Sequence, residues 1–146
     1  MAQIAADRAE VDGRTMRRVA TASLTGTTIE FYDFLIYGLA AALVFNAVFF
    51  PSMGGPEGTL ASIATFGVAF VFRPLGAILF GHYGDRIGRK ATLITTLMIM
   101  GTSTFAIGLL PSVESIGKGA VVILVLLRAL QGIALGGEWT GAALLT

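Results

Sequence analysis

Residues 91–110 read ATLITTLMIMGTSTFAIGLL, a run of twenty residues that contains no charged side chain. A helix needs about 20 apolar residues to cross a hydrocarbon core of about 30 Å. Three further apolar segments of at least this length accompany the run, at residues 19–50, 59–83 and 119–146. The sequence therefore predicts an all-α integral membrane protein with four transmembrane helices.

The composition agrees with this class of protein. Hydrophobic residues make up 55% of the 146 residues and charged residues only 13%, whereas soluble domains carry about 25% charged residues. The chain has no cysteine and a single histidine, His82, which excludes disulfides, thiolate chemistry and a Cys/His metal cluster. We therefore expect no metal and no cofactor, and the net charge of +1 does not indicate nucleic-acid binding.

The basic residues outside these segments predict the orientation of the helices. Residues 1–18 form a polar tail with four arginines, and the connection at residues 82–90 carries three more Lys or Arg residues. The connections at residues 51–58 and 111–119 contain only one base, Lys118. Because cytoplasmic loops retain Lys and Arg, we expect the N-terminus and the second connection to lie in the cytoplasm, with the helices in the cell membrane. We also expect the tail to be largely disordered.

The last apolar segment stops at Thr146 with neither a polar flank nor a basic anchor. We therefore expect the chain to be a fragment of a longer membrane protein. The alternative is a stand-alone four-helix protein or an inactive truncated remnant.

Small residues within the last segment predict close helix packing. Gly132 and Gly136 are four residues apart, as are Gly137 and Gly141. Glycines at this spacing let two membrane helices approach closely, so we expect this segment to have a tightly packed neighbour.

Five ionisable side chains lie inside the predicted helices: Glu30, Asp33, Arg73, Arg128 and Glu138. Each costs about 2.5 to 3.5 kcal/mol at the centre of a bilayer, so we expect them to face a cavity or one another. At a rise of about 1.5 Å per residue, Asp33 and Arg128 both fall near the middle of the membrane and are able to pair. By the same argument, Arg73 is able to pair with Glu30 or Glu138.

The signs of these five charges suggest a role for one carboxylate. Three acids and two bases leave one acid without a partner within these helices. A carboxylate without a base in an apolar medium favours its protonated form, which is typical of a proton carrier. The alternative is that all five groups form static ion pairs, with a base supplied from elsewhere in the protein.

The connection between the second and third segments carries the most specific motif. Residues 81–93 read GHYGDRIGRKATL. A cytoplasmic anchor explains its bases but not its glycines or Asp85. The motif resembles the signature between helices 2 and 3 of the major facilitator superfamily, and the match covers Gly81, Asp85, Arg86, Gly88, Arg89, Lys90 and Leu93. Arg128, Gln131 and Gly132 in RALQG resemble the fourth helix of the same superfamily.

Three longer stretches narrow the resemblance: IEFYDFLIYG at 29–38, FRPLGAILFGHYGDRIGRK at 72–90 and RALQGIALGGEW at 128–139. Together they resemble the metabolite:proton symporter family, whose members carry carboxylates and zwitterions such as 2-oxoglutarate, citrate, shikimate and proline or betaine. Residues 42–51 and 64–76 are most similar to the shikimate-transporter-like branch. The resemblance runs from about Thr21 to the last residue.

The resemblance implies a fold of twelve helices in two halves, of which residues 19–146 would form part of the first half. Substrate sites of this fold lie between the halves, near the middle of the membrane. The chain would then need the remaining helices of the same transporter as its partners, together with a small metabolite, a proton and the lipid bilayer. It would catalyse no covalent reaction.

The resemblance also implies roles for individual residues. Asp33 would be the proton-responsive group, with Arg128 as its partner and Glu30 beside it. The residues expected to line the cavity or touch substrate are Tyr37, Arg73, Gln131, Glu138 and Trp139. The residues expected to form the gating motif are Gly81, Asp85, Arg86, Gly88, Arg89 and Lys90.

Another function within transport is a proton-driven exporter of drugs or metabolites, because the loop signature is shared across the superfamily. The pair of Glu30 and Asp33 favours the symporter branch. A channel is disfavoured, because nothing in the sequence repeats like a selectivity filter.

Overall fold

A computed structural model of the chain describes the backbone of residues 2–143 and the side chains of residues 16, 17, 20, 21, 24–88 and 90–138. The described backbone forms helices and no strands. The helices are α1 (Ala2–Leu43), α2 (Phe45–Phe49), α3 (Gly55–Ile87), α4 (Arg89–Gly108), α5 (Val113–Ile116) and α6 (Gly119–Ala143). The predicted all-α class is confirmed.

The chain divides into two compact units, Met1–Tyr32 and Asp33–Thr146. In the first unit α1 begins at Ala2, so the expectation of a largely disordered tail is wrong. Residues 2–18 consist mostly of good helix formers such as Ala, Arg, Glu and Met, with one glycine and no proline. The hydroxyls of Thr25 and Thr28 donate to the carbonyls of Thr21 and Leu24, four residues earlier, and leave the helix ladder intact.

Three helices of the described chain are long and apolar enough to cross a membrane, at Gly55–Ile87, Lys90–Gly108 and Gly119–Glu138. They correspond to three of the four predicted spans. The first predicted span is divided between α1 and α2, and α1 is not among the three. Glu30, Asp33 and several threonines make α1 less apolar than the other long helices.

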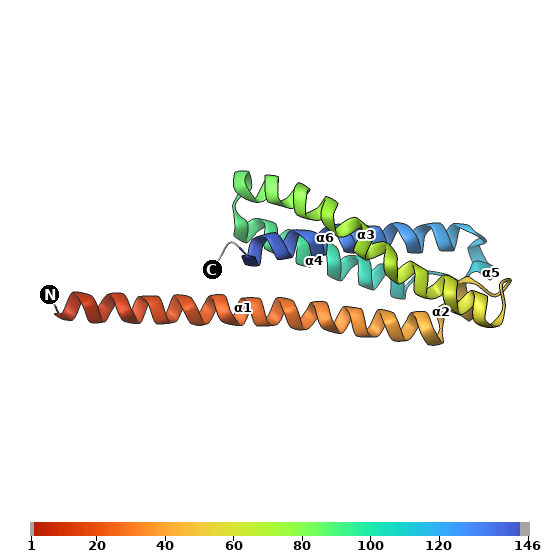
Figure 1. The fold of residues 1–146 in the computed structure, drawn as a ribbon, viewed down its shortest axis with the longest axis horizontal. Helices are drawn as coiled ribbons and strands as arrows, with labels where there is room; N and C mark the ends of the chain where they lie inside the picture. Colours follow the sequence, from red (N-terminus) through yellow and green to blue (C-terminus); the bar gives the residue numbers. More distant parts are fainter. Residues whose placement is uncertain (1, 144–146) are drawn as a thin grey trace. The chain divides into compact units, whose positions relative to one another are not determined.

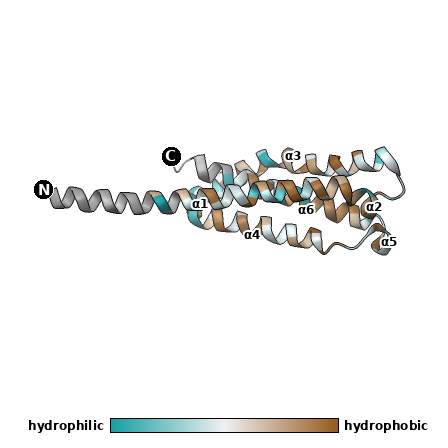
Figure 2. Cartoon of the chain, turned by 90° about the horizontal axis from the view of Figure 1, so that it is seen from below, coloured by the Kyte–Doolittle hydropathy of each residue, from teal (hydrophilic) through white to brown (hydrophobic). Residues whose placement is uncertain are grey.

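The outward faces of the second unit are apolar. Val71 of α3 and Phe105 of α4 expose 73% and 70% of their surface. Figure 2 shows apolar residues along α3, α4 and α6. Large exposed apolar side chains on several adjacent turns are rare on soluble monomers, whereas a lipid environment accommodates them.

α6 lies alongside α3 and α4 (Figure 1). Its contact with α3 is made by backbone atoms, as the glycine spacing predicts. A Cβ added to Gly132 would overlap the backbone of Ala69, and one added to Gly136 would overlap the backbone of Arg73. Gly137 lies close to a side chain instead, the ring of Phe80. The predicted close approach is confirmed for these glycines, whereas the surroundings of Gly141 lie outside the described residues.

The turn between α3 and α4 is shorter than the connection expected at residues 82–90. α3 continues to Ile87 and α4 begins at Arg89, so only Gly88 interrupts the helices. Gly88 has a φ of +99°, a conformation that is essentially restricted to glycine. Much of the loop motif is therefore the last turn of α3.

Candidate functional site

The site is centred on Asp33, which lies on α1 in the second unit and is 7% exposed. Arg128 of α6 is fully buried. Its Nη1 donates to Oδ2 of Asp33 at 3.3 Å, and the two charges form an ion pair. The depth argument from the sequence predicted that these two residues are able to pair, and the structure brings them together.

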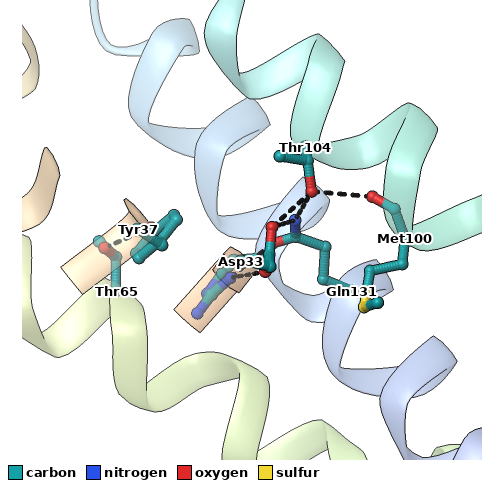
Figure 3. Close-up of polar contacts among 7 residues, drawn as sticks. Asp33, Tyr37, Thr65, Met100, Thr104 and Gln131 are labelled. Carbon is teal, nitrogen blue, oxygen red and sulfur yellow. Dashed lines mark hydrogen bonds and ion pairs between the residues drawn. The ribbon is translucent and has the colours of Figure 1, made fainter. Parts of the chain in front are cut away.

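Gln131 connects the two charged groups through its amide. Nη1 of Arg128 donates to Oε1 of Gln131 at 2.7 Å. This bond fixes the orientation of the amide, because a guanidinium can only donate. Nε2 of Gln131 therefore points toward Asp33, and it donates to Oδ1 at 3.3 Å and to Oγ1 of Thr104 at 2.7 Å (Figure 3).

Thr104 of α4 is the member of the network that the sequence analysis missed. Its hydroxyl donates to Oδ1 of Asp33 at 2.6 Å. The search of the sequence followed only ionisable groups, and α4 has none between residues 91 and 108. The depth calculation would have found it: Thr104 is 14 residues beyond Lys90 and Asp33 is 15 beyond Arg18, which gives about 21 and 22 Å.

Tyr37 lies one turn beyond Asp33 and joins α1 to α3. Its hydroxyl is 2.7 Å from Oγ1 of Thr65, and both side chains are buried. The hydrogen of Thr65 is directed to the carbonyl of Ser62 at 2.6 Å, so Tyr37 is the donor. Thr65 was not predicted either, for the same reason as Thr104.

Aromatic rings cover the rest of the Arg128 guanidinium. Its Cζ lies 3.7 Å from the ring centroid of Tyr37 and 5.1 Å from that of Phe66. No described group accepts a hydrogen bond from its Nε or Nη2. Cation–π contacts of this kind are worth about 2 kcal/mol or more when the pair is desolvated, so the rings stabilise the charge where acceptors do not.

Arg73 of α3 has a similar aromatic environment. Its Cζ lies 4.8 Å from the ring centroid of Phe34 and 4.6 Å from that of Phe70. Phe34 and Phe66 also touch each other, with ring centroids 5.3 Å apart. Phe34 therefore contacts both Arg73 and Arg128, whose Cζ lies 5.8 Å from the same ring centroid.

Asp33 also faces a cavity of about 380 Å³. Its polar wall consists of Asp33, Tyr37, Thr104 and Gln131, and its apolar walls are formed by Ile36, Ala40, Val44, Phe45, Val48, Phe49, Ile107, Gly108 and Leu110. Tyr37 and Gln131 thus lie where a cavity was predicted. Arg73 and Glu138 are not among the residues that line it. The carboxylate is the one acidic group in the lining.

The described part of the predicted gating motif lies at the end of α3. Asp85 and Arg86 are exposed in its last turn, and Lys90 is exposed in the first turn of α4. Gly84, just before them, lies near the side chain of Thr92, where an added Cβ would meet Oγ1 at an ordinary 3.5 Å.

Comparison with known proteins decides the family. Residues 19–146 match the family of sugar (and other) transporters. The chain belongs to this transporter family. The resemblance to major facilitator transporters is thereby confirmed, and the relatives are named as transporters rather than enzymes.

Three of the relatives of this transporter chain come from Escherichia coli. It is 57% identical over 130 residues to the shikimate transporter of Escherichia coli (strain K12). This match covers 89% of the chain and 30% of the relative. It is 56% identical to an inner membrane metabolite transport protein of the same organism, over 88% of the chain and 29% of the relative. It is 41% identical to the Escherichia coli proline/betaine transporter, over 92% of the chain and 27% of the relative. No solved structure matches.

The transporter chain spans less than a third of the length of these relatives. Apolar helices and transporter relatives together make it part of a multi-pass membrane protein. Among the described residues, no group of three His, Cys, Asp or Glu side chains could hold a metal ion.

The roles of five further predicted site residues stay predictions. Glu30 belongs to the first unit and is partly buried. Glu138 is 8% exposed on α6. The pairing of Arg73 with either acid stays a prediction. The side chains of Arg89 and Trp139 lie outside the described residues, and their roles in the transporter also stay predictions.

Proposed function

We propose that the complete gene product carrying these residues is a proton-coupled symporter. It moves a small carboxylate or zwitterionic metabolite across the cytoplasmic membrane by alternating access, with its N-terminus in the cytoplasm. The observation that carries the proposal is the placement of Asp33, which is paired with a buried arginine and lines a cavity at the same time.

The ion pair has the geometry of a contact that can be broken. Strong charge-assisted bonds between nitrogen and carboxylate oxygen are about 2.7 to 2.9 Å long and often bidentate. Arg128 instead makes one contact of 3.3 Å with Asp33. Its stronger bond goes to Gln131 at 2.7 Å, so the guanidinium keeps its place when Asp33 becomes neutral.

The cavity offers a route for the proton. A volume of about 380 Å³ is far more than the roughly 10 to 15 Å³ that one water molecule needs, so water fits beside the carboxylate. Water that enters this space reaches the carboxylate of Asp33, which can then exchange its proton with one side of the membrane. The apolar walls keep the rest of the cavity free of competing acids and bases.

Protonation of Asp33 changes what Arg128 attracts. With Asp33 anionic, the positive charge of Arg128 is balanced within 3.3 Å. With Asp33 neutral, that charge is no longer balanced, and its field attracts an anion into the cavity that Asp33 and Gln131 line. The carboxylate of a solute satisfies this requirement, so proton and solute favour the same state of the protein. Such differential stabilisation of two conformations is the basis of coupled transport.

The names of the relatives support the class of solute. Shikimate, proline and betaine differ in shape and ring structure, and all carry a carboxylate group. A site that recognises this group through a buried cation explains a family with such varied solutes. The further helices that complete the site belong, in this proposal, to the same gene product.

The test is uptake by cells that express the complete gene product with Asp33→Asn. Radiolabelled shikimate is the first solute, followed by proline and betaine, and uptake is measured with and without an inward proton gradient. We expect Asp33→Asn to abolish accumulation against a gradient while solute exchange at equal pH persists, because the amide cannot carry a proton.

The matched control is Glu114→Gln, which makes the same chemical change at an exposed position. This control should accumulate solute like the unchanged protein. Full accumulation by Asp33→Asn would remove Asp33 from the proposed role. Proton-driven transport out of the cell, measured in everted vesicles, would favour the exporter instead.

A further inference from the structure

The hydroxyl of Thr104 lies within hydrogen-bonding distance of three groups. Oγ1 is 2.6 Å from Oδ1 of Asp33, 2.9 Å from the carbonyl oxygen of Met100 and 2.7 Å from Nε2 of Gln131 (Figure 3). Two of these groups are acceptors and one is a donor. A threonine hydroxyl has one hydrogen to donate and two lone pairs that accept hydrogen bonds. Thr104 can therefore donate to only one of its two acceptors at a time.

Which acceptor receives the hydrogen of Thr104 depends on the charge of Asp33. When the carboxylate is anionic, the hydrogen of Thr104 is best placed toward Oδ1, because hydrogen bonds to charged acceptors are shorter and stronger. The observed 2.6 Å is the shorter of its two donor contacts. Nε2 of Gln131 occupies one lone pair of Oγ1, which leaves the second lone pair free.

A proton on Asp33 needs an acceptor, and the surroundings provide one. Oδ2 faces Nη1 of Arg128, which can only donate. Oδ1 faces Nε2 of Gln131, which also only donates, and the amide cannot turn over because Arg128 holds its oxygen. Among the described partners of the carboxylate, Oγ1 of Thr104 is thus the acceptor available to a protonated Oδ1.

We propose that Thr104 is a positioning residue that holds Asp33 in both protonation states by reversing their hydrogen bond. The inference rests on the proposed function of Asp33 as the proton carrier. A hydronium ion in the cavity delivers its proton to Oδ1 and leaves as water. The new O–H of Asp33 donates to Oγ1, and the hydrogen of Thr104 rotates to the carbonyl oxygen of Met100.

This exchange needs no movement of heavy atoms. One hydrogen bond joins Asp33 to Thr104 before and after protonation, and only its direction changes. A carboxyl group whose neutral form is bonded as well as its charged form gains and loses a proton without losing its place. Thr104 therefore keeps Asp33 beside the cavity when the bond to Arg128 weakens.

The other charged and titratable groups around the site stay in place throughout. They are Tyr37 on α1, Arg73 on α3 and Arg128 on α6, and α4 contributes none between residues 91 and 108. A substitution of Thr104 leaves all of them unchanged. Its effect on Asp33 is therefore an effect of the hydroxyl.

The experiment compares Thr104→Val, which removes the hydroxyl, with Thr104→Ser, which keeps it, in the complete gene product. The first measurement is the infrared carbonyl band of the protonated Asp33 carboxyl, identified as the band that Asp33→Asn lacks. We expect this band to move to higher frequency in Thr104→Val, where the O–H has lost its acceptor, and to stay in place in Thr104→Ser.

The second measurement is solute uptake. We expect proton-driven accumulation to fall about tenfold in Thr104→Val, which corresponds to about 1.4 kcal/mol. It should stay close to the unchanged level in Thr104→Ser. Because Thr104 also lines the cavity, exchange at equal pH is measured in the same cells as the reference. The ratio of accumulation to exchange should fall about tenfold in Thr104→Val and stay unchanged in Thr104→Ser, because exchange at equal pH needs no net transfer of protons.

The outcomes separate the two proposals. An unshifted band and normal accumulation in Thr104→Val overturn the role of Thr104 and leave that of Asp33 standing. Equal losses in the Val and Ser variants also overturn it, because the hydroxyl is then irrelevant. If no carboxyl band disappears in Asp33→Asn, Asp33 does not bind a proton and both proposals fail. Thr104→Ala serves as the second hydroxyl-free variant if Thr104→Val does not reach the membrane.

Discussion

The glycine contact between α3 and α6 gives a stability prediction whose sign differs between two similar substitutions. Gly132→Ala places a methyl group against the backbone of Ala69, where the Cβ would lie 2.8 Å from Cα and closer still to the carbonyl oxygen. Gly101→Ala on α4 is the control, because nothing lies within 4 Å of its Cβ position. Both positions are inside helices, at Arg89–Gly108 and Gly119–Ala143.

The control isolates the steric cost. Replacing glycine by alanine inside a helix favours the helix by up to about 1 kcal/mol, and this gain is common to both variants. Forcing an extra methyl into a packed contact costs about 1 to 3 kcal/mol. We therefore expect Gly132→Ala to be less stable than Gly101→Ala by about 1 to 3 kcal/mol, with Gly101→Ala at least as stable as the unchanged protein.

The assay is reversible unfolding of the purified gene product in mixed micelles, followed by circular dichroism. Gly136→Ala is a second test, because its Cβ would lie 2.7 Å from the backbone nitrogen of Ala77. Backbone atoms cannot rotate away as a side chain can, so a change of rotamer does not relieve the overlap with the added methyl group. Equal stability of the Gly132 and Gly101 variants would show that α3 and α6 do not meet at these atoms.

Three further predictions concern the site and the turn. Asp33→Asn and Arg128→Gln should each lower the free energy of unfolding. The double variant should lose about 2 kcal/mol less than the sum of the two single losses, as is typical of residues in one network. Unfolding of all three variants measures this coupling, and simple additivity would contradict the ion pair. Tyr37→Phe should cost about 1 kcal/mol, because it removes one bond without stranding the hydrogen of Thr65, and a much larger loss on unfolding would contradict that arrangement. Gly88→Ala should cost about 1 to 3 kcal/mol because of its positive φ, and an unchanged midpoint of thermal unfolding in detergent would argue against the one-residue turn.

The part of the site that depends on depth could be predicted from the sequence. Each membrane helix rises by a fixed distance per residue. Counting from Arg18 for Asp33, and from the outer start of its helix for Arg128, placed both near the middle of the membrane, and the structure pairs them at 3.3 Å. The same arithmetic applies to Thr104. It was missed because the search began from charge, although a hydroxyl is also a strong hydrogen-bonding group.

The lateral arrangement could not be predicted in the same way. The rings of Tyr37 and Phe66 over Arg128 come from α1 and α3, and a single sequence does not say which helices are neighbours. The start of α1 was also mistaken. Polarity indicated a tail outside the membrane, but polar residues such as Arg and Glu are good helix formers, and hydropathy does not report where a helix begins.

The backbone contact of α3 with α6 has a mechanical consequence. Side chains between two helices can change rotamer and absorb a shift, whereas Gly76, Gly132 and Gly136 leave main chain against main chain. We therefore expect the two helices to move as one rigid body. Asp85 sits at one end of α3, and Arg128 sits partway along α6. We therefore expect a displacement of the turn between α3 and α4 to move both helices together and so to reach Arg128.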